Sequence, residues 1–246
     1  MPQFFISADP VDGRWVIEGD DFRHLTKVRR VRAGDGIILR DKNGDRLQGR
    51  IAEIFDTGMS VEIIDRMAGN APVPEITLCA GILKGKKFDL AIQKAVETGV
   101  LRIVPVVTAR TVPVLEGKEK GKTERWRKIA LEAAKQCMRS DVPSVEEPVE
   151  FARLVAMDFS GVKLIAHTGA DTPGLKDVAR GIGASLHAAL LVGPEGGFTT
   201  EEVARAAAAG WRPVRLGTTA MRAETAAMVL PAILAYEWGE DDEDKS

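Results

Sequence analysis

The chain of 246 residues is 45% hydrophobic, 28% charged and 5% aromatic, which excludes intrinsic disorder and leaves room for one large or two modest domains. Its net charge of -2 excludes a uniformly basic nucleic-acid coat, and no apolar run approaches the roughly 20 residues that span a bilayer. The N-terminus lacks the features of a signal peptide, so we expect a cytoplasmic protein with no membrane partner. The two cysteines and three histidines form no metal-ligand spacing, and both cysteines read as core residues.

Residues 1–70 alternate short extended runs with turns. Asn43-Gly44 stands between two of these runs and is a strong hairpin signal, because both central positions of a type I′ turn need positive φ. This pattern predicts a small all-β barrel or sandwich. The following stretch contains Gly69, Pro72 and Pro74 and is expected to be a linker.

From residue 75 to the end, strand patterns alternate with helix patterns. The predicted strands lie at 76–83, 101–107, 163–169, 188–193 and 213–217. A helix is predicted at 88–98, closed by Gly99, and Thr123 is predicted to cap a longer helix. Such alternation predicts an α/β domain with a mostly parallel sheet covered on both faces.

The stretch LLVGPEGGFTTEEV at 190–203 runs from a strand end into a Pro/Gly loop and then into a helix with a Thr199/Glu202 capping box. The loop matches neither GxGxxG nor GxxxxGK[ST], and Glu195 would repel a phosphate. The glycines could serve backbone geometry alone. Because ligands of open α/β sheets bind at the carboxyl ends of strands, we favour a neutral or cationic ligand held through its adenine and ribose.

A second unusual stretch, RLGTTAMRAETAAMVLPAIL at 215–234, follows the last predicted strand. Arg222 and Glu224 stand where a helix opens and could be no more than a surface ion pair worth about 0 to 1 kcal/mol. Their place beside two glycine-containing strand ends makes a role in chemistry the more interesting interpretation.

Basic residues cluster at 23–32, at 84–87 and at 118–128. Such clusters are usually solvated surfaces, but they are also what phosphate contacts require. The candidate RNA contacts are Arg23, His24, Lys27, Arg29, Arg30 and Arg32 in the first region, with Lys84, Lys86, Lys87 and Arg139 further on.

Together, LLVGPEGGFTTEEV and LGTTAMRAETAA resemble the signature of the 16S ribosomal RNA uracil-N3 methyltransferases, the small subunit methyltransferase E family of the SPOUT superfamily. HLTKVRRVRAGD, KAVETGV and EAAKQCMRSDVP resemble further blocks of that family, so the resemblance covers most of the chain. The chain departs from the pattern at Thr218 and Thr219, where members usually carry Pro and Arg, and in QCMR, where Gly usually precedes Arg.

The resemblance implies a PUA-like RNA-binding β-barrel at 1–70 and a SPOUT methyltransferase domain with a C-terminal trefoil knot at 75–246. It also implies S-adenosylmethionine as methyl donor, a homodimer, and methylation of uridine N3 at position 1498 of 16S rRNA in the small ribosomal subunit. We expect the cofactor to be held by His167, Leu191, Val192, Gly193, Pro194, Glu195, Gly196, Gly197, Leu216, Gly217, Thr218, Ala220, Met221 and Thr225. For His167 the alternative stays open, because a strand histidine is more often satisfied within the protein than in contact with a ligand.

Uridine N3 must lose a proton before or as it is methylated, so a group must stabilise the developing anion or accept the proton. Arg222 is the candidate for the electrostatic role, because a guanidinium stays charged and donates two hydrogen bonds to a planar acceptor. Glu224 could orient Arg222 or cap the helix, and Glu195 could act as a base if burial raises its pKa, or be structural. Two rivals stay open: a methyltransferase of the same fold acting on a tRNA base or a ribose 2′-hydroxyl, and a non-catalytic RNA-binding module.

Overall fold

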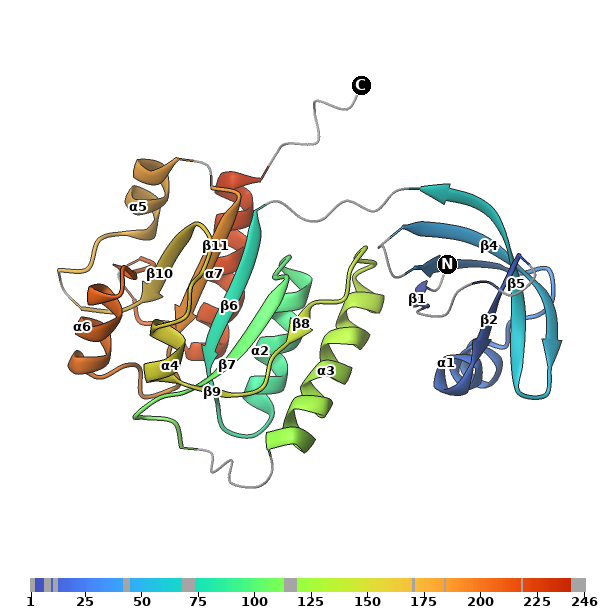
Figure 1. Cartoon of the computed structure of the whole chain (residues 1–246), viewed down its shortest axis with the longest axis horizontal. Coiled ribbons are helices and arrows are strands. Elements are labelled where there is room, and N and C mark those ends of the chain that lie inside the picture. Colours follow the sequence, from blue (N-terminus) through green and yellow to red (C-terminus); the bar gives the residue numbers. More distant parts are fainter. Residues whose placement is uncertain are drawn as a thin grey trace. The chain divides into compact units, whose positions relative to one another are not determined.

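The computed structural model describes residues 3–6, 10, 13–41, 45–67, 74–112, 119–169, 171–183, 185–217 and 219–239. The chain forms two compact units, the first made of Met1–Ala71 with Ala134–Asp141 and the second of Pro72–Ala133 with Val142–Ser246 (Figure 1). The predicted Asn43-Gly44 turn, most of the predicted linker and Thr218 lie outside the described residues.

The first unit is built on one five-stranded sheet with the order β1-β3-β4-β5-β2. β1 runs parallel to β3, and the other pairs are antiparallel. Its elements are β1 (Gln3–Phe5), β2 (Arg14–Glu18), α1 (Gly19–Arg23), η1 (His24–Arg29, a π-helix), β3 (Gly36–Arg40), β4 (Arg46–Phe55) and β5 (Gly58–Met67). Alternate residues of the strands point into one apolar core, and the prediction of a small β domain is confirmed.

The second unit contains a sheet with the order β12-β10-β11-β6-β7-β8, in which β9 also pairs with β7. Every pair in it is parallel, as the alternation of patterns predicts. Its elements are β6 (Glu75–Gly81), α2 (Lys86–Glu97), β7 (Arg102–Val107), α3 (Glu119–Gln136), β8 (Ser144–Val145), β9 (Val149–Glu150), α4 (Phe151–Val155), β10 (Val162–Ala166), α5 (Leu175–Ile182), β11 (His187–Val192), α6 (Thr200–Ala208), β12 (Arg212–Val214) and α7 (Ala223–Trp238).

Helices cover both faces of this sheet (Figure 1). On one face, α4 and α6 enclose a core in which Ala189 and Leu191 of β11 meet Trp211 and Phe151. Successive side chains of a strand point to opposite faces, so Leu190 and Val192 belong to the other face, where α7 and α2 pack. A strand that is buried on both faces explains the unbroken apolar run of β11.

The structure corrects the prediction for Thr123. Helix α3 begins at Glu119, and Thr123 is a fully buried residue inside it. Its hydroxyl donates to Glu147 Oε2 at 2.9 Å, so it serves a tertiary contact and not a helix cap. Of the two cysteines, Cys79 is fully buried, whereas Cys137 is only half-buried and lies one residue beyond α3.

Candidate functional site

The carboxyl ends of the parallel strands lie at one edge of the second unit's sheet. The glycine loop, residues 193–197, follows β11, which lies between β10 and β6 near the middle of the strand order. Because all strands run in the same direction, the segments after β6, β7, β10 and β12 emerge at the same edge. Ligand sites of open α/β sheets are found at this edge, and most of the predicted cofactor residues lie there.

The glycine loop is held from both sides by neighbouring strand ends. A Cβ at Gly81, the last residue of β6, would come within 2.5 Å of the Pro194 nitrogen and 2.9 Å of the Gly193 carbonyl carbon. From the end of β7, Arg110 Nη1 donates to the Gly196 carbonyl at 2.6 Å. The Arg110 side chain also lies 3.2 Å from where a Gly196 Cβ would stand. The loop therefore has a fixed backbone shape.

Glu195 ties the glycine loop to the segment after β6. Its Oε1 accepts a hydrogen bond from the Lys84 main-chain N–H at 3.1 Å and lies 3.6 Å from Lys87 Nζ. Partial burial alone would raise the pKa of Glu195, but the backbone N–H groups of Glu195 and Lys84, together with Lys87, outweigh it and lower the pKa. The raised pKa that a general base at Glu195 requires is therefore not found.

The predicted capping box is confirmed. Thr199 and Glu202 exchange hydrogen bonds with each other's main-chain N–H groups at the start of α6. The other carboxylate oxygen of Glu202 accepts from the Ala109 N–H at 2.8 Å. The cap thus also anchors the turn that carries Arg110.

The second predicted loop, residues 215–222, is separated from the glycine loop by one strand. β10 lies between β11 and β12, so the two loops begin about 10 Å apart at a spacing of roughly 4.8 Å per strand. His167 follows the intervening β10, and its N–H donates to Val214 O at 2.9 Å. The predicted cofactor residues therefore lie on both sides of His167.

Arg215 fixes the start of this second loop. Its main-chain N–H donates to Pro173 O, and its side chain donates to Thr172 O at 2.7 Å and to Gly217 O at 2.9 Å. Gly217 has a φ of +66°, which favours glycine, and no atom lies within 4 Å of the place of its absent Cβ. The same is true of Gly197 in the glycine loop.

Arg222 and Glu224 lie at the start of α7, where Arg222 is the exposed N-cap residue. They form no ion pair with each other among the described residues, so the interpretation as a simple surface pair is not supported. Glu224 Oε2 is buried and has no hydrogen-bond partner in the described part of the chain. A buried carboxylate oxygen normally accepts a hydrogen bond, so a bound ligand or another arrangement of the 215–222 loop should supply the donor for Glu224 Oε2.

The candidate RNA contacts of the first unit lie on α1, η1 and the residues that follow. Arg23, His24, Lys27, Arg29, Arg30 and Arg32 are all exposed. Arg23 is already paired with Asp20, whereas Lys27, Arg29, Arg30 and Arg32 form no ion pair within the described ranges.

Of the later candidates, Lys84, Lys86 and Lys87 are exposed around the start of α2. Arg139 is different. Its side chain is only 10% exposed and makes two hydrogen bonds to Asp141, with Nε 3.0 Å from Oδ1 and Nη2 2.7 Å from Oδ2. Its carbonyl accepts from Gln3 Nε2 in the same unit. The structure thus gives Arg139 a structural contact, and we leave it out of the proposed interface.

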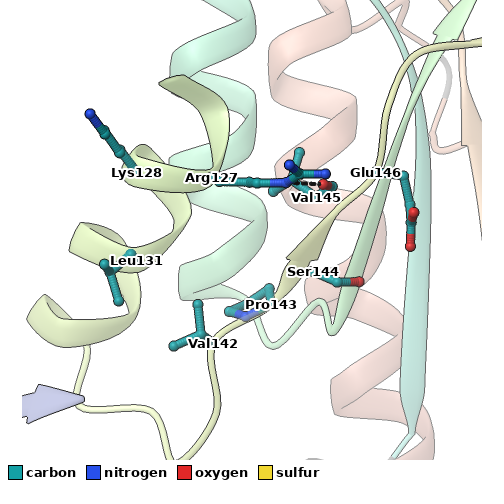
Figure 2. Close-up of a pocket in the computed structure, with 8 residues that line it drawn as sticks. All are labelled: Arg127, Lys128, Leu131, Val142, Pro143, Ser144, Val145 and Glu146. Carbon is teal, nitrogen blue, oxygen red and sulfur yellow. Dashed lines mark hydrogen bonds between the residues drawn. The ribbon is translucent and has the colours of Figure 1, made fainter. Parts of the chain in front are cut away.

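A hollow of about 490 Å³ lies elsewhere, between α3 and the edge strand β8 (Figure 2). Arg127 reaches across it from α3 and donates from Nε to Val145 O at 2.9 Å. Glu146 is paired with Arg102 at 3.2 Å. None of the predicted site residues lines this hollow, so we do not assign the site there.

Two residues that the sequence does not single out shape the site: Gly81 and Arg110. The glycine in a strand pattern and the arginine in the turn after the next strand are weak signals by themselves. A general rule could have pointed to both, because strand ends in a parallel sheet share one edge.

Within the described ranges, no group of three or more His, Cys, Asp or Glu residues is arranged to hold a metal ion. No helix in the described part of the chain is long and apolar enough to cross a membrane.

Two family models match the chain. An RNA methyltransferase domain matches residues 70–235, and an RNA methyltransferase PUA domain matches residues 17–64. The chain is 31% identical to ribosomal RNA small subunit methyltransferase E of Bacillus subtilis, over 90% of this chain and 89% of the relative. It is 30% identical to the Mycobacterium bovis protein of the same name, over 92% and 88%.

Two solved structures are similar to this chain over nearly its whole length. A ribosomal RNA small subunit methyltransferase E from Neisseria gonorrhoeae, bound to S-adenosyl methionine, has a TM-score of 0.87 and 30% identity and covers 97% of this chain and 98% of that one. A Legionella pneumophila methyltransferase in complex with bound cofactor SAM also has a TM-score of 0.87, at 27% identity, with the same coverage.

Proposed function

The chain belongs to the ribosomal RNA small subunit methyltransferase E family, and on that premise we propose that it methylates N3 of a uridine in 16S rRNA with S-adenosylmethionine as donor. The observation that carries this proposal is the arrangement of the two glycine-containing loops at one edge of a parallel sheet, followed by the Arg222-x-Glu224 helix start. The substrate we propose is the small ribosomal subunit, in the cytoplasm.

The residues at this edge fit S-adenosylmethionine. Gly197 and Gly217 leave open space beside exposed backbone, which an adenosine can approach closely enough to hydrogen-bond. The rigid loop carries no cation at its tip, in keeping with a ligand that has no phosphate. The residues that would hold the cofactor are His167, Leu191, Val192, Gly193, Pro194, Gly196, Gly197, Leu216, Gly217, Ala220, Met221 and Thr225, with Thr218 outside the described residues.

When bound, S-adenosylmethionine supplies a methyl group to the nucleophile, and the electron pair of the broken carbon–sulfur bond stays on sulfur. The nucleophile must therefore lie in line with that bond. The chain's part is to hold both partners in that geometry. The exposed guanidinium of Arg222, without an ion pair among the described residues, donates to a uracil carbonyl oxygen and stabilises the negative charge that develops as N3 loses its proton to water.

Glu224 and Glu195 are positioning residues in this proposal. The buried Oε2 of Glu224 would accept a hydrogen bond from a donor that the bound cofactor supplies, and this would position the neighbouring Arg222. Glu195 is an ionised side chain that fastens the glycine loop to Lys84 and Lys87. Neither carboxylate is needed as a base.

Exposed cations supply the contacts to RNA phosphates. In the first unit these are Lys27, Arg29, Arg30 and Arg32, and in the second Lys84 and Lys86, whereas Lys87 is paired with Glu195. Phosphate contacts of this kind position the substrate without reading its sequence.

We also propose a homodimer that uses α7. This helix is apolar on nearly all sides, and its stripe of Val229, Ala232, Ile233 and Tyr236 is not fully covered within the chain. Tyr236 is 86% exposed. Light scattering after gel filtration tests this: Tyr236→Lys should convert a dimer into a monomer, and a monomeric wild type would contradict the proposal.

Nucleoside analysis of rRNA tests the function itself. A strain lacking this protein should lose N3-methyluridine from its 16S rRNA. Restoring the gene should restore this nucleoside. Loss of a modified tRNA base or of a ribose 2′-O-methyl group would favour the other RNA substrates. An unchanged set of nucleosides would favour a non-catalytic RNA-binding module.

A further inference from the structure

One surface turn of the first unit combines cations that have no ion-pair partner among the described residues with an exposed apolar side chain. Helix α1 runs directly into the π-helix η1, and the turn ends at Arg30, whose φ of +54° is unusual for a residue with a side chain. Val28, which is 67% exposed, stands between Lys27 and Arg29 in the chain, and Arg30 follows. Isolated exposed apolar residues are common, so the surroundings of Val28 decide whether it has a role.

The turn is firmly anchored beneath Val28. Leu25 of the same π-helix is fully buried in the core of the unit, and Phe22 and Val31 pack against that core from either end of the turn. The Val31 N–H donates to Leu25 O, and Thr26 Oγ1 donates to Phe22 O at 2.8 Å. Phe22, Leu25 and Val31 therefore pack toward the core, whereas Val28 is exposed.

The exposed residues next to Val28 in the chain are cations. Lys27, Arg29, Arg30 and Arg32 have no ion-pair partner in the described residues, and no acid occurs between Phe22 and Gly34. Cations alone would bind the phosphates of any RNA. An apolar side chain among them gains nothing from a duplex, whose base faces are covered by stacking, but it can pack on the open face of an unpaired base.

We propose that Val28 packs against an unpaired nucleobase while the flanking cations hold the neighbouring phosphates, so that this turn prefers single-stranded or looped RNA over duplex RNA. The proposal rests on the RNA substrate of the proposed function and adds the class of RNA structure that this turn selects. It assigns the preference to one uncharged side chain.

The test measures binding of the full chain to a short labelled single-stranded RNA and to the same strand annealed to its complement, over a range of salt concentrations. Val28→Ser should weaken binding to the single strand about fivefold to tenfold and leave duplex binding unchanged. The salt dependence should stay the same because no charge is removed. Val28→Ile should retain the single-strand preference.

Ile64→Ser is the matched control, because Ile64 on β5 is 57% exposed and lies outside this turn. It should leave both affinities unchanged. The double variant Arg29→Ala, Arg30→Ala should bind both the single strand and the duplex more weakly, and its binding should depend less steeply on salt concentration. Equal losses for both RNAs with Val28→Ser, or no loss, would overturn the proposal. Methyl transfer to small ribosomal subunits by the wild type, measured alongside, shows whether the proposed function stands independently of Val28.

Discussion

Replacing Gly81 by alanine places a methyl group against the backbone of the glycine loop. The new Cβ would lie 2.5 Å from the Pro194 nitrogen, about 0.9 Å closer than the 3.4 Å at which ordinary contact begins. The neighbour is main chain and not the end of a flexible side chain, so the loop itself must retreat. Overpacking of this kind costs about 1–3 kcal/mol of stability.

A loop displaced by nearly 1 Å should bind S-adenosylmethionine on the order of tenfold more weakly, which corresponds to about 1.4 kcal/mol. Ligand at 100 times Kd stabilises the wild type by about 2.7 kcal/mol, and the variant at the same concentration by about 1.4 kcal/mol. At roughly 2–4 °C per kcal/mol, the ligand-induced rise in Tm should fall from about 5–11 °C to about 3–6 °C.

The assay is thermal unfolding with and without S-adenosylmethionine, supported by calorimetric titration. Gly121→Ala is the matched control, because no atom lies within 4 Å of its new Cβ in α3. It should keep the full ligand-induced rise. If Gly81→Ala binds the cofactor as tightly as the wild type, the glycine loop does not hold the cofactor in the way proposed.

Three further predictions follow from the site. Arg110→Met keeps an alkyl chain beside the glycine loop but loses the hydrogen-bond donor to the Gly196 carbonyl. Steady-state kinetics should therefore show KM for S-adenosylmethionine rising about fivefold with kcat little changed, and an unchanged KM would contradict this role. Glu195→Gln should lower Tm at pH 7, because the ionised carboxylate stabilises the folded protein. Folding lowers the pKa of Glu195 from 4.5, so the wild type should lose its higher Tm as the pH falls through that lowered pKa. A Tm difference between the two proteins that persists at strongly acid pH would contradict this role. Glu224→Met removes a buried carboxylate oxygen that has no partner among the described residues, so Tm should stay equal or rise. The rate of methyl transfer should fall at least about tenfold, and full activity would show that Glu224 is not part of the site.

The sequence predicts best what is decided locally. The capping box of Thr199 and Glu202 depends on residues three positions apart, and the strand after Ala188 is an unbroken apolar run. Both were confirmed because their hydrogen bonds and burial follow from the local pattern.

Contacts between distant segments are harder to predict. The Arg110 contact with the glycine loop joins residues 86 positions apart, and the hydroxyl of the buried Thr123 finds its partner in Glu147, 24 positions along the chain. Arg139 is a different case: its partner Asp141 stands only two positions away, but a base near an acid in the sequence does not show whether the two side chains pair or face solvent. These positions depend on the folded arrangement, which overrides the local preference.

Methylation of isolated small ribosomal subunits with isotopically labelled S-adenosylmethionine, followed by nucleoside analysis, tests the central claim most directly. Wild-type protein should place the label on N3-methyluridine of 16S rRNA, and Arg222→Ala should reduce the rate by about a hundredfold while the cofactor still raises Tm. Label on any other nucleoside, or an undiminished rate with Arg222→Ala, would contradict it.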